Sequence, residues 1–189
     1  MTKRGEPRAI RHEYEAHGVS SFYRTQGSAY RNPHEPQIAR SLEIAIKEWQ
    51  MDLSRVLDLA AGSGEATLPL RNLGAGLIDG IDPFTFDAYQ ERTGQIAGRV
   101  TFEQIAAGAL AGRGYTLIVC SFAMHLVEPS RLPHLAMQLS LVGDRLLILT
   151  PHKRPAIRGE WGWRFEGERV VQRVRSRLYR STSRGVHRE

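Results

Sequence analysis

Between residues 37 and 150 the apolar positions follow two alternating patterns, which together predict an α/β protein. Residues 37–49 have apolar side chains at helical spacing, and short apolar runs typical of strands then alternate with segments at helical spacing. The predicted strands are 55–59, 76–81, 99–105, 115–121 and 144–150, and the predicted later helices are 65–72, 84–92 and 129–141. This alternation is typical of a doubly wound, mostly parallel sheet with helices on both faces.

The two ends of the chain depart from this pattern. Residues 1–36 are polar and aromatic, and prolines at 33 and 36 break any continuous helix, so we expect an N-terminal cap segment there. At 189 residues the chain is most simply a single domain, with residues 37–189 as its main body. After residue 151 we expect a short antiparallel C-terminal end of two strands. A helix is the alternative for residues 169–179, whose apolar residues also fit a helical stripe.

The net charge of +6 is unevenly distributed. Residues 151–189 hold eleven Lys and Arg against four Glu, a net charge of +7, whereas residues 1–150 have a net charge of −1. A basic C-terminal segment of this kind can contact phosphates, so nucleic acid is one candidate partner. The single cysteine, Cys120, excludes an internal disulfide and a zinc site built from cysteines, and we expect no metal. No apolar run is long enough for a bilayer and no signal-peptide pattern is present, so we expect a cytoplasmic protein without membrane contact.

The most informative motif is an apolar strand that passes through an acid into a loop of small residues. It reads Val56-Leu57-Asp58-Leu59-Ala60-Ala61-Gly62-Ser63-Gly64. Small residues let the main chain approach a ligand closely, and the helix that follows offers unpaired N–H groups. Asp82 comes at the carboxyl end of the next predicted strand, where it can accept hydrogen bonds from ribose hydroxyls. The pair predicts a nucleoside-cofactor site. A nicotinamide-binding loop would need a third glycine where Thr67 stands.

With these motifs the chain resembles the class I S-adenosylmethionine-dependent methyltransferases, which have a Rossmann-like fold. The first family motif is matched by Asp58, Ala60, Gly62 and Gly64, with Ala in the place of the first glycine. We expect that difference to be mild, because Ala tolerates a tight loop where φ is negative. The second motif is matched by Gly80-Ile81-Asp82-Pro83. The segment 117–125, Leu-Ile-Val-Cys-Ser-Phe-Ala-Met-His, resembles the pattern of methyltransferases that act on small molecules.

The resemblance implies S-adenosylmethionine as cofactor and assigns a role to several residues. Asp58 would hold the methionine ammonium, Gly62 and Gly64 would let the backbone run under the methionine and ribose, and Asp82 would bind the ribose hydroxyls. The acid that often reads adenine after the third strand is absent, so backbone at Ile105 and Ala106 would read the base, with Pro83 or Phe84 as an apolar floor. The expected cofactor-binding residues are Asp58, Ala60, Gly62, Gly64, Asp82, Pro83, Phe84, Ile105, Ala106 and Ser121.

Two residues are candidates for catalysis. Methyl transfer from a sulfonium is a direct displacement, so alignment and exclusion of water can supply much of the rate. His125, after strand 115–121, is the best general base if the acceptor must lose a proton. Tyr30 in the cap could face the sulfonium and gain cation–π attraction. His152 and His34 are weaker candidates, and each of these side chains has an alternative role in packing.

Three functions stay open at this level. The first is a methyltransferase that acts on a small-molecule acceptor, which the segment 117–125 and the balanced charge of residues 1–150 favour. The second is an RNA methyltransferase that uses the basic C-terminal segment. The third is a noncatalytic cofactor-binding or partner subunit. The sequence does not specify the acceptor or the oligomeric state.

Overall fold

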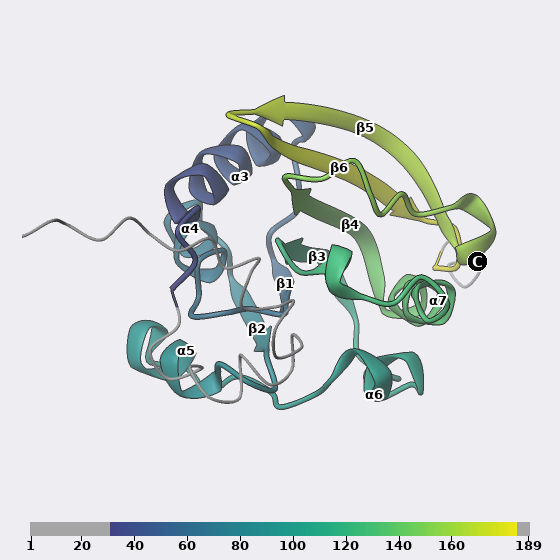
Figure 1. Cartoon of the computed structure of the whole chain (residues 1–189), viewed down its shortest axis with the longest axis horizontal. Helices are drawn as coiled ribbons and strands as arrows, with labels where there is room; N and C mark the ends of the chain where they lie inside the picture. Colours follow the sequence, from purple (N-terminus) through teal and green to yellow (C-terminus); the bar gives the residue numbers. More distant parts are fainter. Residues whose placement is uncertain (1–30, 185–189) are drawn as a thin grey trace, which may run out of the picture.

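The structure is a computed structural model that describes residues 31–184, and one six-stranded sheet organises it (Figure 1). The strand order is β2-β1-β3-β4-β6-β5. The strands are β1 (Arg55–Leu59), β2 (Leu77–Ile81), β3 (Tyr115–Ser121), β4 (Gly143–Thr150), β5 (Trp163–Val171) and β6 (Val174–Ser181). The first four strands in this order are parallel, whereas β6 runs antiparallel to β4 and β5 antiparallel to β6. The predicted mostly parallel sheet and its antiparallel C-terminal end are therefore confirmed, and the helical alternative for residues 169–179 is wrong.

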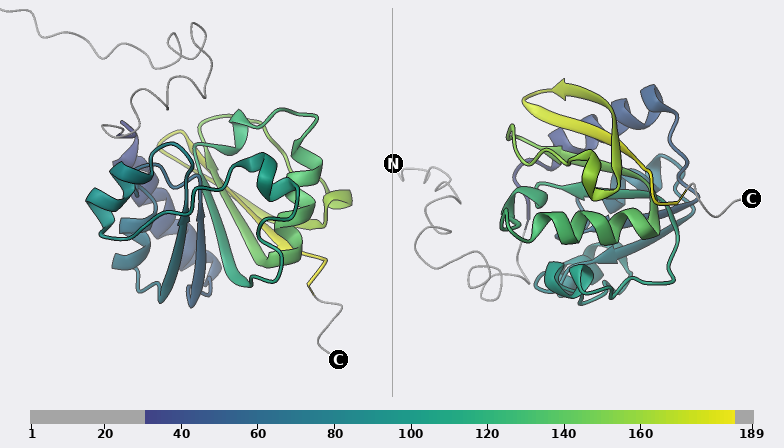
Figure 2. Two further views of the ribbon diagram at one scale, coloured as in Figure 1. Left: turned by 90° about the horizontal axis from the view of Figure 1, so that it is seen from below. Right: turned by 90° about the vertical axis from the view of Figure 1, so that its right-hand side faces the viewer.

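Helices cover both faces of this sheet, as the two views of Figure 2 show. On one face lie α3 (Glu35–Trp49), α4 (Thr67–Asn72) and α5 (Phe86–Thr93), and on the other lie α6 (Phe102–Ala106) and α7 (Leu132–Val142). Two short 3-10 helices, η2 (Met124–Leu126) and η3 (Gly159–Trp161), follow β3 and precede β5. Each parallel strand ends at the same edge of the sheet, so the loops after β1, β2 and β3 meet there.

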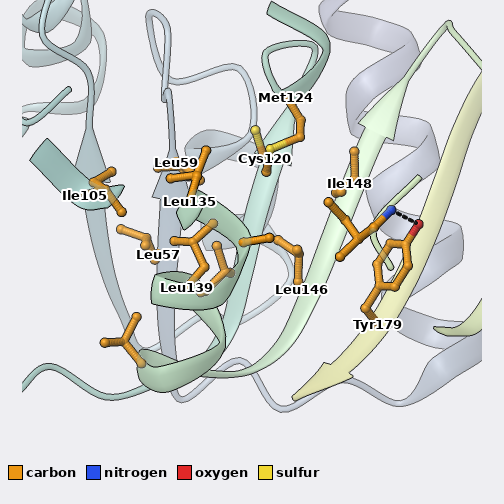
Figure 3. Packing of buried hydrophobic residues seen from close by; sticks show 14 of the residues in the cluster. Leu57, Leu59, Ile105, Cys120, Met124, Leu135, Leu139, Leu146, Ile148 and Tyr179 are labelled. Atoms are coloured by element: carbon orange, nitrogen blue, oxygen red, sulfur yellow. Dashed lines mark hydrogen bonds between the residues drawn. The ribbon is translucent and has the colours of Figure 1, made fainter. Parts of the chain in front are cut away.

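The apolar runs form these strands because successive side chains point to opposite faces, and here both faces are covered. In β1, Val56 packs in the core under α3, whereas Leu57 and Leu59 pack in the core under α7. Figure 3 shows the second of these clusters, with Leu135 and Leu139 of α7 against the sheet.

One predicted strand, 99–105, is wrong. Only a single parallel bridge, Ile81 to Gly98, continues the sheet beyond β2, and α6 begins at Phe102. The reason is a capping box: the Thr101 side chain accepts from the Gln104 backbone N–H, and the Gln104 side chain accepts from the Thr101 backbone N–H. The sequence Thr-Phe-Glu-Gln carried this signal, although the apolar residues around it also fitted a strand.

Candidate functional site

A cavity of about 180 Å³ lies at the carboxyl edge of β1, β2 and β3. It is lined by Leu59, Ala60, Gly62, Ile81, Asp82, Pro83, Phe84, Val100, Thr101, Phe102, Glu103, Ser121, Phe122, Ala123 and Leu126. Six of the ten expected cofactor-binding residues are among them: Ala60, Gly62, Asp82, Pro83, Phe84 and Ser121. The chain thus brings the small-residue loop, the second acid and the end of β3 together around one hollow, where open α/β sheets bind ligands.

The small-residue loop takes left-handed backbone at three alternate positions: Ala60 (φ 57°), Gly62 (φ 59°) and Gly64 (φ 93°). The expectation of a negative φ at Ala60 is therefore wrong. An L-residue in this conformation costs roughly 1–2 kcal/mol. The Ala61 N–H donates to the Ile81 carbonyl oxygen at 3.0 Å, which ties the loop to the end of β2.

Gly64 does not line the cavity, and its lack of a side chain serves packing. A Cβ at this position would lie 2.6 Å from Thr93 Cγ2 at the end of α5, closer than side chains come in proteins. Gly64 therefore lets α5 approach the loop.

Asp82 joins the loop to the segment after β2. Its Oδ2 accepts from the Gly62 N–H at 3.1 Å, and its Oδ1 accepts from the N–H groups of Phe84 and Thr85, each at 2.9 Å. The side chain is buried and lines the cavity. Asp79, the other acid of this segment, lies inside β2, does not line the cavity and instead accepts from the Tyr115 hydroxyl at 2.9 Å. Asp82 therefore holds the turn after β2 and also lines the cavity.

Asp58 is fully buried behind the loop and does not line the cavity. Its Oδ2 accepts from the Thr67 hydroxyl at 2.7 Å, whereas its Oδ1 has no hydrogen-bond partner. Burial is the main cause that raises the pKa of Asp58 to about 7, and the charges of Glu65 and Asp82 raise it further. A buried carboxylate with one unpartnered oxygen is costly, and a cation beside it would stabilise the charge.

Of the residues expected around the base, Pro83 and Phe84 line the cavity, whereas Ile105 and Ala106 do not. Ile105 points into the core under α7, and Ala106 packs against the same core, so neither lines the cavity. Phe102 and Glu103 line it instead, because α6 begins there and turns its first residues toward the hollow. The sequence analysis did not assign these two residues, and the capping box at Thr101 was the signal that would have located them.

Two histidines meet beside the cavity, at the ends of adjacent strands. His125 lies in η2, between the cavity-lining Ala123 and Leu126, and its ring centroid is 4.5 Å from that of His152 after β4. His125 Nδ1 is buried without a hydrogen-bond partner. Burial, and secondly the charge of His152, lower the pKa of His125 to about 4, so its imidazole is neutral at physiological pH.

Phe122, which lines the cavity directly after β3, is a further residue that the sequence analysis did not assign. Its φ is 55°, a conformation that costs energy for a residue with a side chain. The His34 ring stacks on it with 5.4 Å between ring centroids, which brings the N-terminal side of α3 to the cavity. Tyr30 lies outside the described residues.

Charged side chains fasten the chain before α3 to the small-residue loop. Glu65 is buried and accepts from the Ser63 hydroxyl at 2.6 Å and from the Asn32 N–H at 2.8 Å. Arg92 of α5 pairs with Glu35 of α3 at 2.6 Å and also donates to Ser63. These contacts tie the loop to the start of α3 and to α5.

The basic C-terminal strands carry their own counter-charges. Arg177 pairs with Glu168 at 2.7 Å, and Arg169 pairs with Glu48 of α3 at 2.6 Å. Further pairs join Arg175 to Glu168, Arg180 to Glu166, and Arg184 to Asp144. Much of the positive charge of residues 163–184 therefore faces carboxylates within the protein.

Within residues 31–184, no group of three or more His, Cys, Asp or Glu side chains could hold a metal ion. None of the helices in this part of the chain is long and apolar enough to cross a membrane. Cys120 is buried in β3, where burial raises the pKa of its thiol to about 12.

Several solved structures share this architecture. Magnesium protoporphyrin IX methyltransferase from Synechocystis PCC 6803, solved with bound SAM, has a TM-score of 0.56 at 18% identity and covers 90% of this chain and 93% of its own. The mitomycin 7-O-methyltransferase MmcR has a TM-score of 0.62 at 15% identity, over 92% of this chain and 60% of its own. The PH0226 protein from Pyrococcus horikoshii OT3 has a TM-score of 0.62 at 11% identity, over 90% of this chain and 99% of its own. At these identities the likeness concerns the fold.

In sequence, no protein-family model matches the chain. A Schizosaccharomyces pombe protein, designated uncharacterized protein C17A5.05c, is 30% identical, and the match covers 94% of each protein. The chain therefore belongs to one family with C17A5.05c, and its fold is that of the class I methyltransferases.

Proposed function

We propose that this protein is an S-adenosylmethionine-dependent methyltransferase that acts on a small-molecule acceptor. The observation that carries the proposal is the hydrogen bond between Asp82 and Gly62, because both residues line the cavity at the edge of the sheet where open α/β folds bind nucleosides.

The residues present fit such a cofactor. A carboxylate offers about four acceptor sites, and three of those on Asp82 are used by N–H groups of the protein. One site is left for a ribose hydroxyl. Pro83, Phe84 and Phe102 give the cavity apolar walls for a base, and Ser121 and Phe122 close its β3 side. When bound, the cofactor would supply a methyl group activated by a sulfonium.

The chain's own contribution is to align the acceptor, exclude water and remove a proton. His125 is suited to the last task, because its imidazole is neutral, lies next to cavity residues and has a buried nitrogen without a partner. The ring of His152 lies 4.5 Å from that of His125, centroid to centroid, and its charge would disfavour the protonated form of His125.

Two observations support a small molecule over RNA. The arginines of β5 and β6 pair with Glu48, Glu166 and Glu168, which leaves less free positive charge for a phosphate backbone. In addition, two of the similar structures are named for the methylation of small molecules, a magnesium porphyrin and a mitomycin.

Calorimetric titration with S-adenosylmethionine and S-adenosylhomocysteine tests the cofactor. We expect micromolar binding of both, and no binding of either would overturn the proposal. A screen of hydroxyl, amine and thiol acceptors, followed by detection of S-adenosylhomocysteine, tests the activity. The same assay with total RNA at 50 and 200 mM salt tests the alternative, because RNA-dependent turnover that falls steeply with salt would indicate an RNA methyltransferase. Binding without turnover on any acceptor would indicate a noncatalytic subunit.

A further inference from the structure

A phenylalanine in a left-handed backbone conformation stands where β3 ends at the cavity. The Phe122 N–H still donates to the Leu149 carbonyl oxygen of β4 at 2.8 Å, so the hydrogen bonding of the sheet reaches this residue. Its φ of 55° then turns the chain away from the strand direction. Glycine takes this conformation freely, whereas a residue with a side chain takes it at an energetic cost. Backbone strain of this kind clusters at active sites and ligand sites.

Phe122 lies on a different side of the cavity from the walls assigned to a base. Pro83 and Phe84 follow β2, and β1 lies between β2 and β3 in the sheet. Phe102 comes from α6, which covers the face of the sheet opposite α3. Phe122 instead packs against the core under α3 and also lines the cavity. The cavity therefore has an aromatic residue that the base does not account for.

The imidazole of His34 braces the Phe122 ring. The two rings are stacked, with 5.4 Å between their centroids and 25° between their planes. His34 is the N-cap residue of α3, but its side chain makes no capping hydrogen bond. Its backbone is held on both sides, because its N–H donates to Asn32 Oδ1 and its carbonyl oxygen accepts from the Ile38 N–H, each at 2.9 Å. The start of α3 thus holds the His34 ring against Phe122.

Two further imidazoles lie at the same strand ends. His125 comes three residues after Phe122, and its ring centroid is 4.5 Å from that of His152, which follows β4. Because β3 and β4 are adjacent parallel strands, the segments that follow them are neighbours. Four flat rings, counting His34, are therefore gathered there. Rings of this kind bind a planar π system well, because aromatic pairs gain energy from offset stacking and from edge-to-face contact.

We propose that Phe122, braced by His34, is the surface on which the methyl acceptor stacks, and that the acceptor is a planar aromatic or heteroaromatic molecule. This role rests on the proposed function and narrows its acceptor from small molecules in general to one class. Phe122 contacts the acceptor, whereas His34 is a positioning residue that acts through Phe122. The affinity for a flat ring then depends on both side chains, and the affinity for the cofactor depends on neither.

The test measures the binding of two probes to the protein saturated with S-adenosylhomocysteine. 2-Naphthol is planar and aromatic, whereas decahydro-2-naphthol has the same carbon skeleton and hydroxyl but is saturated. We expect calorimetry to show roughly threefold or greater preference for 2-naphthol. Phe122→Leu should weaken 2-naphthol binding roughly three- to tenfold and leave decahydro-2-naphthol binding unchanged. Phe122→Tyr, which keeps the ring, should retain the preference, and His34→Ala should lower it. Phe165→Leu is the matched control, because this exposed ring of β5 does not line the cavity.

The outcomes separate this role from the proposed function. Equal affinity of the wild type for the two probes, or no binding of 2-naphthol, overturns the acceptor surface, and the proposed function stands as long as S-adenosylhomocysteine binds. Weaker S-adenosylhomocysteine binding in Phe122→Leu would place Phe122 against the cofactor and also overturn the role. If Phe122→Leu does not fold, His34→Ala decides, because it removes the brace and keeps Phe122.

If the wild type does not bind S-adenosylhomocysteine, the proposed function fails. The same two titrations on the free protein then decide whether Phe122 forms a surface for flat rings. A preference for 2-naphthol that Phe122→Leu removes would support that surface, and equal affinities for the two probes would overturn it.

Discussion

Asp82 Oδ2 accepts a hydrogen bond from the Gly62 N–H across 3.1 Å, so the acid that ends β2 holds the loop that follows β1. The same carboxylate holds the segment before α5 through Phe84 and Thr85. The two sequence motifs are thus parts of one structure, and the shape of the cavity depends on both.

This junction makes Asp82→Ala a test of the site. We expect cofactor affinity to fall at least tenfold, because a charged hydrogen bond contributes on the order of 1.5 to 3 kcal/mol. The free energy of unfolding should also fall by about 2 kcal/mol, since three N–H groups lose their acceptor. Calorimetry and urea denaturation measure the two effects.

Two further variants separate binding from folding. Asp82→Asn keeps an oxygen for Phe84 and Thr85, so we expect a smaller loss of stability and a comparable loss of affinity. Asp79→Asn changes the acid of β2 that is bonded to Tyr115, and it should leave affinity unchanged. Full affinity in Asp82→Asn would mean that Asp82 serves the fold alone.

The backbone conformation of Ala60 predicts that glycine at this position stabilises the protein. The φ of Ala60 is 57°, so Ala60→Gly should relieve backbone strain. The free energy gained exceeds the cost of the greater conformational entropy that glycine has in the unfolded chain. We expect the free energy of unfolding to rise by about 0.5–1 kcal/mol, measured by urea denaturation. Ala61→Gly, at the next position, is the matched comparison. Ala61 is not among the residues with positive φ, so this variant should lower the free energy of unfolding by a similar amount. A loss of stability in both variants would contradict the strain at Ala60.

Asp58 predicts a dependence of stability on pH. Its pKa is raised from the ordinary 3.8 to about 7 in the folded protein, so between these values the folded state binds a proton that the unfolded state has lost. The contribution of Asp58 to stability therefore declines as pH rises from about 4 to 7 and is constant above. Asp58→Asn removes this titration. We expect the free energy of unfolding of the variant, taken relative to that of the wild type, to be greater at pH 8 than at pH 4 by on the order of 2 to 4 kcal/mol.

The same titration tests the role that the family resemblance implies for Asp58. If Asp58 holds the cofactor's ammonium, its ionised form is the one that binds, so the affinity for S-adenosylhomocysteine should rise between pH 6 and 8 in the wild type and be flat in Asp58→Asn. Calorimetry at three pH values measures this dependence. An affinity in the wild type that does not change with pH would show that the ligand makes no use of Asp58.

Much of the fold could be predicted from the sequence because buried parallel strands appear as bounded apolar runs. The predicted 55–59 and 115–121 coincide with β1 and β3. The predicted strand 99–105 failed because its apolar residues fit two periods, and the capping box at Thr101 decides between them. Local hydrogen bonds, here, override a short apolar pattern.

The candidate site was predictable where a residue type implies a position, and not where tertiary packing sets the geometry. Asp82 follows a strand and reaches the cavity, as expected. The left-handed backbone of Ala60 and Phe122 depends on contacts with other strands, which no local pattern encodes. The close approach of the Tyr89 ring of α5 to Gly80 of β2 was not predicted either, although a glycine inside a predicted strand is the sign that would have pointed to it.

His125 gives the prediction that links the site to chemistry. Its pKa is lowered to about 4 by burial and by His152, so the neutral form that can accept a proton is present across the physiological range. For an acceptor hydroxyl, kcat should show no loss between pH 8 and 5, and an ordinary histidine would lose activity near its usual 6.5. His125→Gln should lower kcat by roughly 10²–10⁴-fold with little change in cofactor affinity.

His152→Gln removes a like charge, so the acid limb of the kcat profile should move to higher pH. An acid limb near 6.5 in the wild type that persists in His125→Gln would assign the base to another residue, and an unchanged kcat in His125→Gln would show that alignment alone suffices.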